Sequence, residues 1–259
     1  MADERTVAIL HTNDFHNHLL PVQAEFIGRR KRDAGENALL LDAGDAISAG
    51  NVGVRIGGEP ILELMSDTGY DAMTMGNREF HVADSLLRHK IDKARFPILC
   101  ANIRYQKESD TVLPVQSSIT RTLPNGLIVT IIGVTVPMVT SKMAARVLSS
   151  YLFDDPVPVV ASIVSKLRDT SDIIVALTHI GIKEDHRLAE SVPGLNLIIG
   201  GHTHVVLTEP QVVGDVPIVQ AGWFGHYLGQ IELTAHGSSV VISHSSLTDI
   251  RQAKAGRKA

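Results

Sequence analysis

The order of apolar and polar residues along the chain constrains its fold more than any other feature. Short runs of Val, Ile and Leu alternate with segments in which apolar residues recur at helical spacing. This alternation predicts repeated strand–helix–strand units and hence an α/β fold. Strands are expected at 7–11, 39–41, 72–75, 98–101, 127–136, 173–178, 197–200, 218–220, 229–235 and 239–245, helices at 22–33, 60–68, 84–93, 157–169 and 184–191, and hairpin turns at 124–126 and 236–237.

Length and charge narrow the class of protein. The 259 residues are 44% hydrophobic, which is enough to fill a core, and no linker or shift of composition divides them. We therefore expect one domain over 1–259, with its core at about 5–250. The 24 Lys and Arg against 28 Asp and Glu leave a net charge of −4, which argues against binding to a nucleic acid polymer. The longest apolar run, 127–139, is interrupted by Gly133 and Pro137, so no membrane span is expected.

The two ends and the cysteine content add further expectations. Charged residues at 3–5 lead directly into an apolar strand, and the features of a signal peptide are missing. This pattern predicts a cytoplasmic protein. An exported protein whose signal peptide has been removed would have the same sequence pattern. The polar end at 254–259 is expected to fray. Cys100 is the only cysteine, so an internal disulfide and a multi-thiolate zinc site are both excluded, whereas 12 histidines keep metal binding open.

Side chains of metal-ligand type follow five of the predicted strands. Asp14, Asp45 and Asn77 succeed one another at intervals of about one strand–helix unit, which returns the chain to the same edge of a sheet. Ligands of open α/β sheets bind at this carboxyl edge. We therefore expect the side chains to converge in space. The full set is Asp14, His16, Asp45, Asn77, His179, His202 and His204.

Seven donors are too many for one ion and suit two. A carboxylate between two cations can bridge them, and Asp45 is the candidate for this role. Imidazole mixed with carboxylate and amide oxygen favours Mn, Zn, Fe or Co over Mg and Ca, which prefer oxygen alone. The sequence therefore predicts two divalent metal ions of unspecified identity.

Each donor also has a structural interpretation when taken alone. Asp14 and His16 suit a turn after a strand, Asp45 suits a helix cap, and Asn77 suits a left-handed turn. The pair His202 and His204 on a glycine-rich loop has less reason to exist for packing. The recurrence of such residues after five strands favours the metal interpretation.

These segments resemble the signature blocks of the calcineurin-like metallophosphoesterases, and more narrowly the amino-terminal catalytic domain of the 5'-nucleotidase and UDP-sugar hydrolase family. The resemblance extends from Val7 to about Ile250. It implies a four-layer fold of two packed mixed β-sheets flanked by helices. It also implies that Asp14, His16, Asp45 and His204 hold one metal and that Asp45, Asn77, His179 and His202 hold the other. The blocks are 10–16, 44–45, 76–80, 178–181 and 200–204.

The resemblance implies hydrolysis of a small phosphate ester, either a monoester or a diester, with nucleotides among the candidate substrates. A hydroxide bridging the two ions would attack phosphorus in line, and no Cys or Ser motif suggests a covalent intermediate. The alternative is a non-catalytic metal-binding scaffold with the same fold. The sequence gives no indication of the oligomeric state.

Two departures from the family bear on this function. Arg78 and His81 stand where the family usually has His and Asp. We expect Arg78, together with Asn77, to bind phosphate, and we expect His81 to transfer a proton if residues 78–81 begin a helix. A structural ion pair for Arg78 and a packing role for His81 are the alternatives. The carboxyl-terminal domain that stacks the nucleobase in the family is not expected here, and Trp223 either lines the pocket or packs elsewhere.

Overall fold

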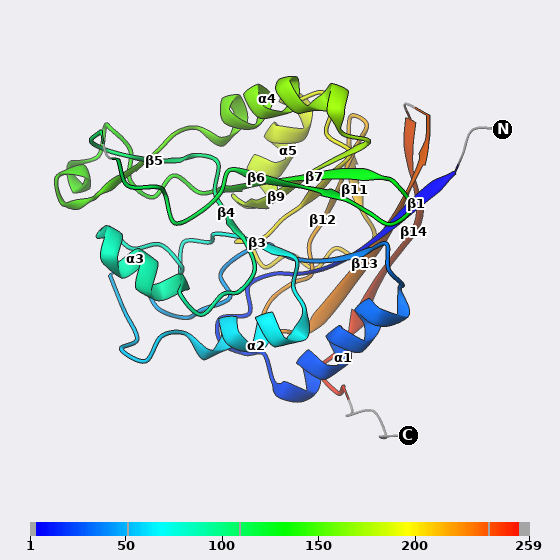
Figure 1. Cartoon of the computed structure of the whole chain (residues 1–259), viewed down its shortest axis with the longest axis horizontal. Coiled ribbons are helices and arrows are strands. Elements are labelled where there is room, and N and C mark those ends of the chain that lie inside the picture. Colours follow the sequence, from blue (N-terminus) through cyan, green and yellow to red (C-terminus); the bar gives the residue numbers. More distant parts are fainter. Residues whose placement is uncertain (1–3, 51, 109, 238, 254–259) are drawn as a thin grey trace.

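The structure is a computed structural model that describes residues 4–50, 52–108, 110–237 and 239–253. Two six-stranded sheets lie face to face in the described part of the chain (Figure 1). The first sheet runs in the order β14 (Ser239–Asp249), β13 (Tyr227–His236), β1 (Arg5–Thr12), β2 (Ala38–Asp42), β3 (Ala72–Thr74) and β4 (Ile98–Leu99). The second runs β11 (Gln211–Val213), β12 (Val216–Val219), β10 (Leu197–Ile199), β9 (Ile173–His179), β7 (Ile128–Thr135) and β6 (Ser118–Thr122).

Both sheets are mixed: the first has antiparallel strands at one edge and the second has them at both edges. In the first sheet β1 to β4 are parallel, and the β13–β14 hairpin pairs antiparallel to β1. In the second sheet β12, β10, β9 and β7 are parallel, and β11 and β6 pair antiparallel at the edges. A small antiparallel pair joins β5 (Ile103–Tyr105) to β8 (Tyr151–Phe153). Parallel strands of one sheet end at one edge, so this topology fixes where the loops after the strands gather.

Helices cover the outer face of each sheet. In Figure 1 the helices α1 (Pro21–Asp33), α2 (Pro60–Thr68) and α3 (Asp84–Ile91) lie on one side, and α4 (Pro156–Leu167) and α5 (Ile182–Ser191) lie on the other. Two short 3₁₀ turns, Ala144–Leu148 and Arg168–Thr170, complete the helical elements of the described ranges. The result is the expected four-layer arrangement, so the predicted fold class of two packed mixed sheets flanked by helices is confirmed.

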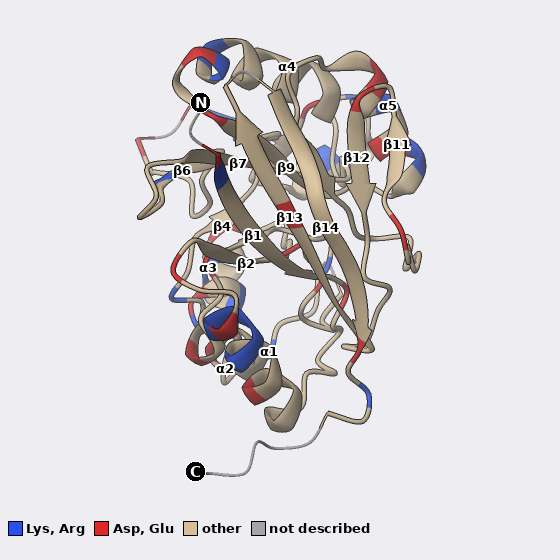
Figure 2. Cartoon of the chain, turned by 90° about the vertical axis from the view of Figure 1, so that its right-hand side faces the viewer, with Lys and Arg blue, Asp and Glu red and all other residues tan. Residues whose placement is uncertain are grey.

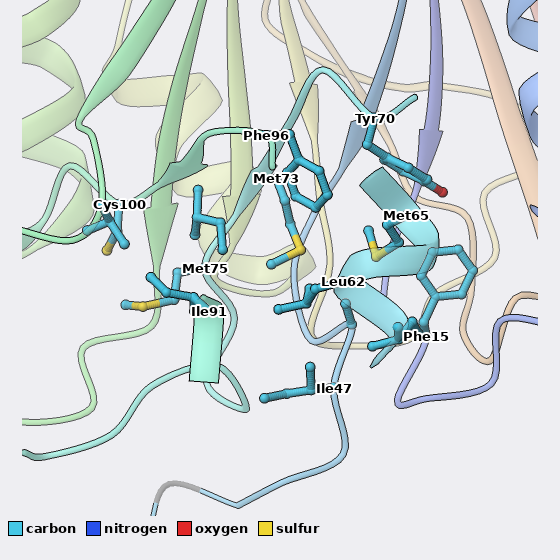
Figure 3. Packing of buried hydrophobic residues seen from close by; sticks show 14 of the residues in the cluster. Phe15, Ile47, Leu62, Met65, Tyr70, Met73, Met75, Ile91, Phe96 and Cys100 are labelled. Atoms are coloured by element: carbon cyan, nitrogen blue, oxygen red, sulfur yellow. The ribbon is translucent and has the colours of Figure 1, made fainter. Parts of the chain in front are cut away.

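Three apolar clusters hold the layers together. Successive side chains of a strand face opposite ways, so one strand contributes to the clusters on both faces of its sheet. In β1, Val7 and Ile9 face the second sheet, whereas Leu10 faces the helices. The cluster between the sheets, which we call the inter-sheet core, also contains Leu41 of β2 and Leu177 of β9. Figure 3 shows part of the helix-side cluster of the first sheet.

Local signals place the helix boundaries. Proline occupies the first turn of α1, α2 and α4, where it costs no hydrogen bond. The Asp155 carboxylate caps α4 by accepting from the Val157 N–H, and Gly69, whose φ of 94° favours glycine, directly follows α2. Two side chains of the basic run at 29–32, at the end of α1 (Figure 2), have polar partners: Lys31 contacts Asp71 at 2.7 Å and Arg30 donates to Gln230.

The predicted elements differ from the observed ones mainly at their ends. The helix at 60–68 was predicted with its observed bounds, and α1, α4 and α5 begin one or two residues earlier than predicted. The strands β5, β8 and β11 were not predicted; β5 and β8 pair only with each other, and β11 is an edge strand. The helix predicted at 84–93 begins at Asp84 as expected and ends at Ile91, and residues 77–79 form a turn, so the condition set for His81, a helix starting at 78–81, is not met. The expected fraying of 254–259 lies outside the described residues.

None of the helices within the described ranges has the length and apolar character needed to cross a bilayer.

Shortening a side chain in the inter-sheet core tests how much the packing between the two sheets stabilises the protein. We expect Leu41→Ala to lower the free energy of unfolding by about 2–5 kcal/mol, because Leu41 is fully buried between the sheets and the change leaves a cavity. Leu148→Ala, at a side chain that is 80% exposed, should change it by less than about 0.5 kcal/mol. Urea unfolding measures both, and equal effects would contradict the proposed packing.

Candidate metal centre

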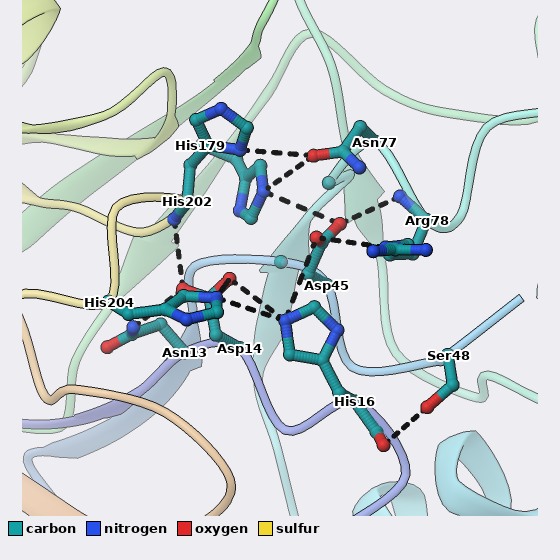
Figure 4. A network of polar contacts seen from close by, with 12 residues as sticks. Asn13, Asp14, His16, Asp45, Ser48, Asn77, Arg78, His179, His202 and His204 are labelled. Atoms are coloured by element: carbon teal, nitrogen blue, oxygen red, sulfur yellow. Dashed lines mark hydrogen bonds and ion pairs between the residues drawn. The ribbon is translucent and has the colours of Figure 1, made fainter. Parts of the chain in front are cut away.

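The seven side chains predicted as metal ligands converge at the edge where both sets of parallel strands end (Figure 4). Asp14 and His16 follow β1, Asp45 follows β2, and Asn77 follows β3. His179 is the last residue of β9, whereas His202 and His204 follow β10. The donors therefore come from two sheets, which the strand-end argument alone did not require.

Three donors form what we call the first cluster. The Nε2 atoms of His16 and His204 lie 3.6 and 3.2 Å from Asp14 Oδ1, and they lie 3.1 Å from each other. One ligand atom from each residue lies within 4.8 Å of the others. Two imidazole nitrogens and a carboxylate oxygen at this spacing could hold one cation.

Three further donors form the second cluster. Asn77 Oδ1 lies 3.3 Å from His179 Nε2 and 3.1 Å from His202 Nδ1. His179 is fully buried, whereas His202 is exposed, so this cluster opens to solvent on one side.

Asp45 lies between the two clusters and turns one oxygen toward each. Its Oδ1 is 3.4 Å from His179 Nε2, and its Oδ2 is 4.0 Å from His16 Nε2. The two groups have the same membership as the two ligand sets that the family resemblance implies. Asp45 therefore contacts donors of both clusters.

Unpaired atoms show that a cation would suit these donors. Asp14 Oδ2 accepts from the His202 N–H at 2.9 Å, but the buried Oδ1 has no hydrogen-bond partner. His179 Nδ1 lies 2.7 Å from the Ala43 carbonyl oxygen and donates to it, so Nε2 would carry a lone pair whenever the imidazole is neutral. That lone pair faces Asp45 Oδ1 and the oxygen of Asn77, neither of which has a proton to give. Buried acceptors that face one another are costly unless a positive charge lies between them.

The pKa shifts express the same demand for positive charge. Burial opposes ionisation of His179, but the carboxylates of Asp45 and Asp14 outweigh it and raise the pKa of this imidazole to about 10. Burial raises the pKa of the Asp14 carboxyl, but this effect is outweighed by His16 and His204, which hold the pKa well below its usual range. The pKa of the Asp45 carboxyl is lowered as well, chiefly by His179 against the effect of burial. Asp14 and Asp45 are therefore both kept ionised, which is the state that binds a metal.

The backbone of the site is in an unusual conformation. Non-glycine residues seldom adopt positive φ, and each such residue costs of the order of 1–3 kcal/mol. Backbone strain of this kind persists where the surrounding structure fixes it, and it gathers at functional sites. Five of the seven donors have positive φ: Asp14 (54°), His16 (47°), Asp45 (55°), His202 (75°) and His204 (57°).

Backbone hydrogen bonds and two glycines hold this conformation. The loops after β1 and β2 are joined by the Asp14 N–H to the Gly44 carbonyl and by the His16 N–H to the Asp45 carbonyl, both at 2.9 Å. A Cβ at Gly76 would collide with Asp45, and one at Gly201 would collide with the Ala43 carbonyl oxygen. Only glycine allows the loops to approach this closely.

Two buried polar residues support the donors. The Glu79 carboxylate accepts from the backbone N–H groups of Asp45, Gly76 and Ile47 at 2.8–3.1 Å. The Asn13 amide, to which sequence reasoning assigned no role, donates to Asp14 Oδ2 and to the Gly222 carbonyl oxygen. Its partners are mostly backbone atoms, which no sequence pattern reveals.

Arg78 and His81 have different surroundings. The Arg78 side chain is 43% exposed, its Nε lies 3.9 Å from Asp45 Oδ2, and that Nε has no hydrogen-bond partner. The His81 ring is buried, and its Nδ1 accepts from the Ala83 N–H at 3.0 Å. Burial and the charge of Lys90 lower the pKa of His81. Arg78 therefore lies beside Asp45, whereas His81 contacts the backbone of Ala83 and of Val52.

Comparison with known proteins agrees with this geometry. The family model of the calcineurin-like phosphoesterases matches residues 7–206, and the chain belongs to this family. It is 30% identical to the uncharacterized metallophosphoesterase YunD of Bacillus subtilis, with 87% of this chain and 49% of that protein aligned. It is 28% identical to human 5'-nucleotidase, with 92% and 50% aligned.

Solved structures give the same assignment. The 5'-nucleotidase precursor of Thermus thermophilus superposes with a TM-score of 0.81 at 26% identity, over 95% of this chain and 54% of that one. The chain spans about half the length of each of these relatives. The predicted resemblance is therefore confirmed, and the family supports a metal-dependent phosphoesterase.

Removal of Glu79 tests the support beneath the donors. Glu79→Ala would leave three backbone N–H groups without their acceptor, and we expect it to lower the free energy of unfolding by about 3 kcal/mol or more. Glu63→Ala, at an exposed position of α2, should change it by less than about 0.5 kcal/mol. Urea unfolding compares the two, and a small effect at Glu79 would argue against its supporting role.

Proposed function

We propose that this chain hydrolyses small phosphate esters with two divalent metal ions, of which Mn, Zn, Fe and Co suit the donors best. Asp14, His16 and His204 would hold one ion, Asn77, His179 and His202 would hold the other, and Asp45 would bridge them. When bound, such a pair supplies an activated water and neutralises charge on the phosphate. The observation that carries the proposal is the position of Asp45, with one oxygen toward each cluster.

The protein side chains would orient the ester. Arg78 lies beside Asp45 and is 43% exposed, so the rest of its guanidinium group is free to bind phosphate oxygens. The 3.9 Å separation from Asp45 is too long for a strong ion pair, which supports a binding role over a purely structural one. Asn77 would lie next to the same phosphate, since its amide belongs to the second cluster.

The proton for the leaving group has no obvious donor in this arrangement. Arginine stays charged at neutral pH and cannot act as a general acid. A proton-transfer role for His81 stays a prediction, and the local geometry gives it little support, because the ring is buried and the backbone of Ala83 and Val52 occupies its polar atoms. We therefore propose that the leaving alcohol departs with little assistance. The cytoplasmic location and the preference for monoesters or diesters also stay predictions.

The proposal predicts a specific dependence on the leaving group. Protein loaded with Mn or Zn should hydrolyse aryl phosphates, whose leaving groups are acidic, much faster than alkyl phosphates. Arg78→Ala should lower kcat/KM for both kinds by about 10²–10³-fold, the effect of removing one stabilising donor. Arg104→Ala, at a surface arginine paired with Asp154, is the control and should leave both rates unchanged.

Three outcomes would contradict parts of the proposal. Equal rates across leaving groups would show that the proton is delivered efficiently. Full activity of Arg78→Ala would remove its role in binding phosphate. Two bound ions without turnover of any monoester or diester would favour the non-catalytic scaffold. Metal content measured on the same samples separates the last outcome from incomplete loading.

A further inference from the structure

An aromatic group borders the first cluster. Trp223 and Phe224 lie in the loop that follows β12, and His18 lies in the loop that follows β1. The Trp223 ring is nearly parallel to the His204 ring, with centroids 5.8 Å apart and an interplanar angle of 18°. The centroids of the Phe224 and His18 rings lie 4.3 Å apart. We call Trp223, Phe224 and His18 the aromatic rim.

The rim is not part of the hydrophobic core. Neither Trp223 nor Phe224 belongs to any of the three apolar clusters, and both are only partly buried. Aromatic side chains gain most by burial, so two of them together beside a polar centre call for an explanation other than packing. In a protein with 4% aromatic residues, this concentration is a marked local enrichment.

The backbone fixes the rim to the candidate metal centre. Phe224 has a φ of 55°, which is unusual for a bulky residue, and its N–H donates to the Asp14 carbonyl oxygen at 2.8 Å. Asn13 joins the same loop to Asp14 through the Gly222 carbonyl oxygen. The rings are therefore held at a set position relative to the clusters, at a cost in backbone strain.

We propose that the aromatic rim binds a planar ring carried by the leaving group of the ester, as in an aryl phosphate or a nucleoside monophosphate, and that Trp223 is the residue that sets this preference. The inference rests on the proposed function, which supplies the phosphate anchor at the clusters. A flat ring gains from stacking on indole and phenyl faces, whereas a sugar or glycerol leaving group presents no aromatic face. The rim lies beside His204, so a phosphate at the clusters would bring its leaving group within reach of it.

Tryptophan fluorescence reports binding at the aromatic rim, because Trp223 is the only tryptophan in the chain. We would load the protein with Zn, which does not quench fluorescence, and titrate it with AMP and with ribose 5-phosphate while exciting at wavelengths that adenine does not absorb. AMP should change the tryptophan emission saturably and bind about tenfold more tightly than ribose 5-phosphate, since one stacked base contributes about that much. Ribose 5-phosphate should bind without the emission change.

Variants make the assignment specific. Trp223→Ala should reduce the preference for AMP over ribose 5-phosphate by about tenfold, and Trp223→Phe should retain most of it. Calorimetry measures both affinities without requiring turnover or a tryptophan. Phe26→Ala, at a partly buried ring on α1, is the control and should keep the wild-type preference.

The outcomes separate this inference from the proposed function. Equal affinities for the two esters in the wild-type protein, or an unchanged preference in Trp223→Ala, would overturn the role of the rim even if both esters are hydrolysed. Preferential binding of AMP that is lost in Trp223→Ala, without hydrolysis of any ester, would support the rim as a binding site and overturn the proposed function.

Discussion

Apolar packing between the two sheets is the contact on which the candidate site depends. Val7, Ile9 and Leu41 of the first sheet share the inter-sheet core with Leu177 of the second. Neither sheet carries a complete cluster. The first cluster needs His204 from the second sheet to join Asp14 and His16, and the second needs Asn77 from the first to join His179 and His202. Separation of the sheets would therefore divide both clusters.

The site concentrates features that cost stability. Five donors lie on left-handed backbone, and the buried Oδ1 of Asp14 has no hydrogen-bond partner. The surrounding structure maintains this arrangement through the Glu79 carboxylate, the Asn13 amide and the hydrogen bonds between loops. Strain and unpaired acceptors in one place are typical of a site that is organised before its ligand arrives. A pair of cations would relieve the electrostatic part of this cost.

The sequence could predict the layers and the convergence of the donors because both follow from local patterns. The alternation of Val7, Ile9 and Leu10 between two apolar surroundings is a period of two, and Asp14, Asp45 and Asn77 recur with the strand–helix units. It could not predict the supporting role of Asn13, because the partners of this amide are mostly backbone atoms distant in sequence.

The turn at 77–79 was also beyond sequence reasoning. The Glu79 carboxylate folds back to accept from the Gly76 N–H, which shapes the turn that precedes the helix beginning at Asp84. The positive φ at His204 has no signal in the sequence apart from the glycines at 200 and 201, and the position of Trp223 beside that ring depends on a loop distant along the chain. Whether the seven donors bind metal stays a prediction.

Anomalous X-ray scattering from crystals grown with Zn or Mn tests the central claim most directly. The account predicts two anomalous peaks, one among Asp14, His16 and His204 and one among Asn77, His179 and His202, with a carboxylate oxygen of Asp45 next to each. No peak at either cluster, or a single peak whose ligands leave one cluster empty at saturating metal, would contradict it.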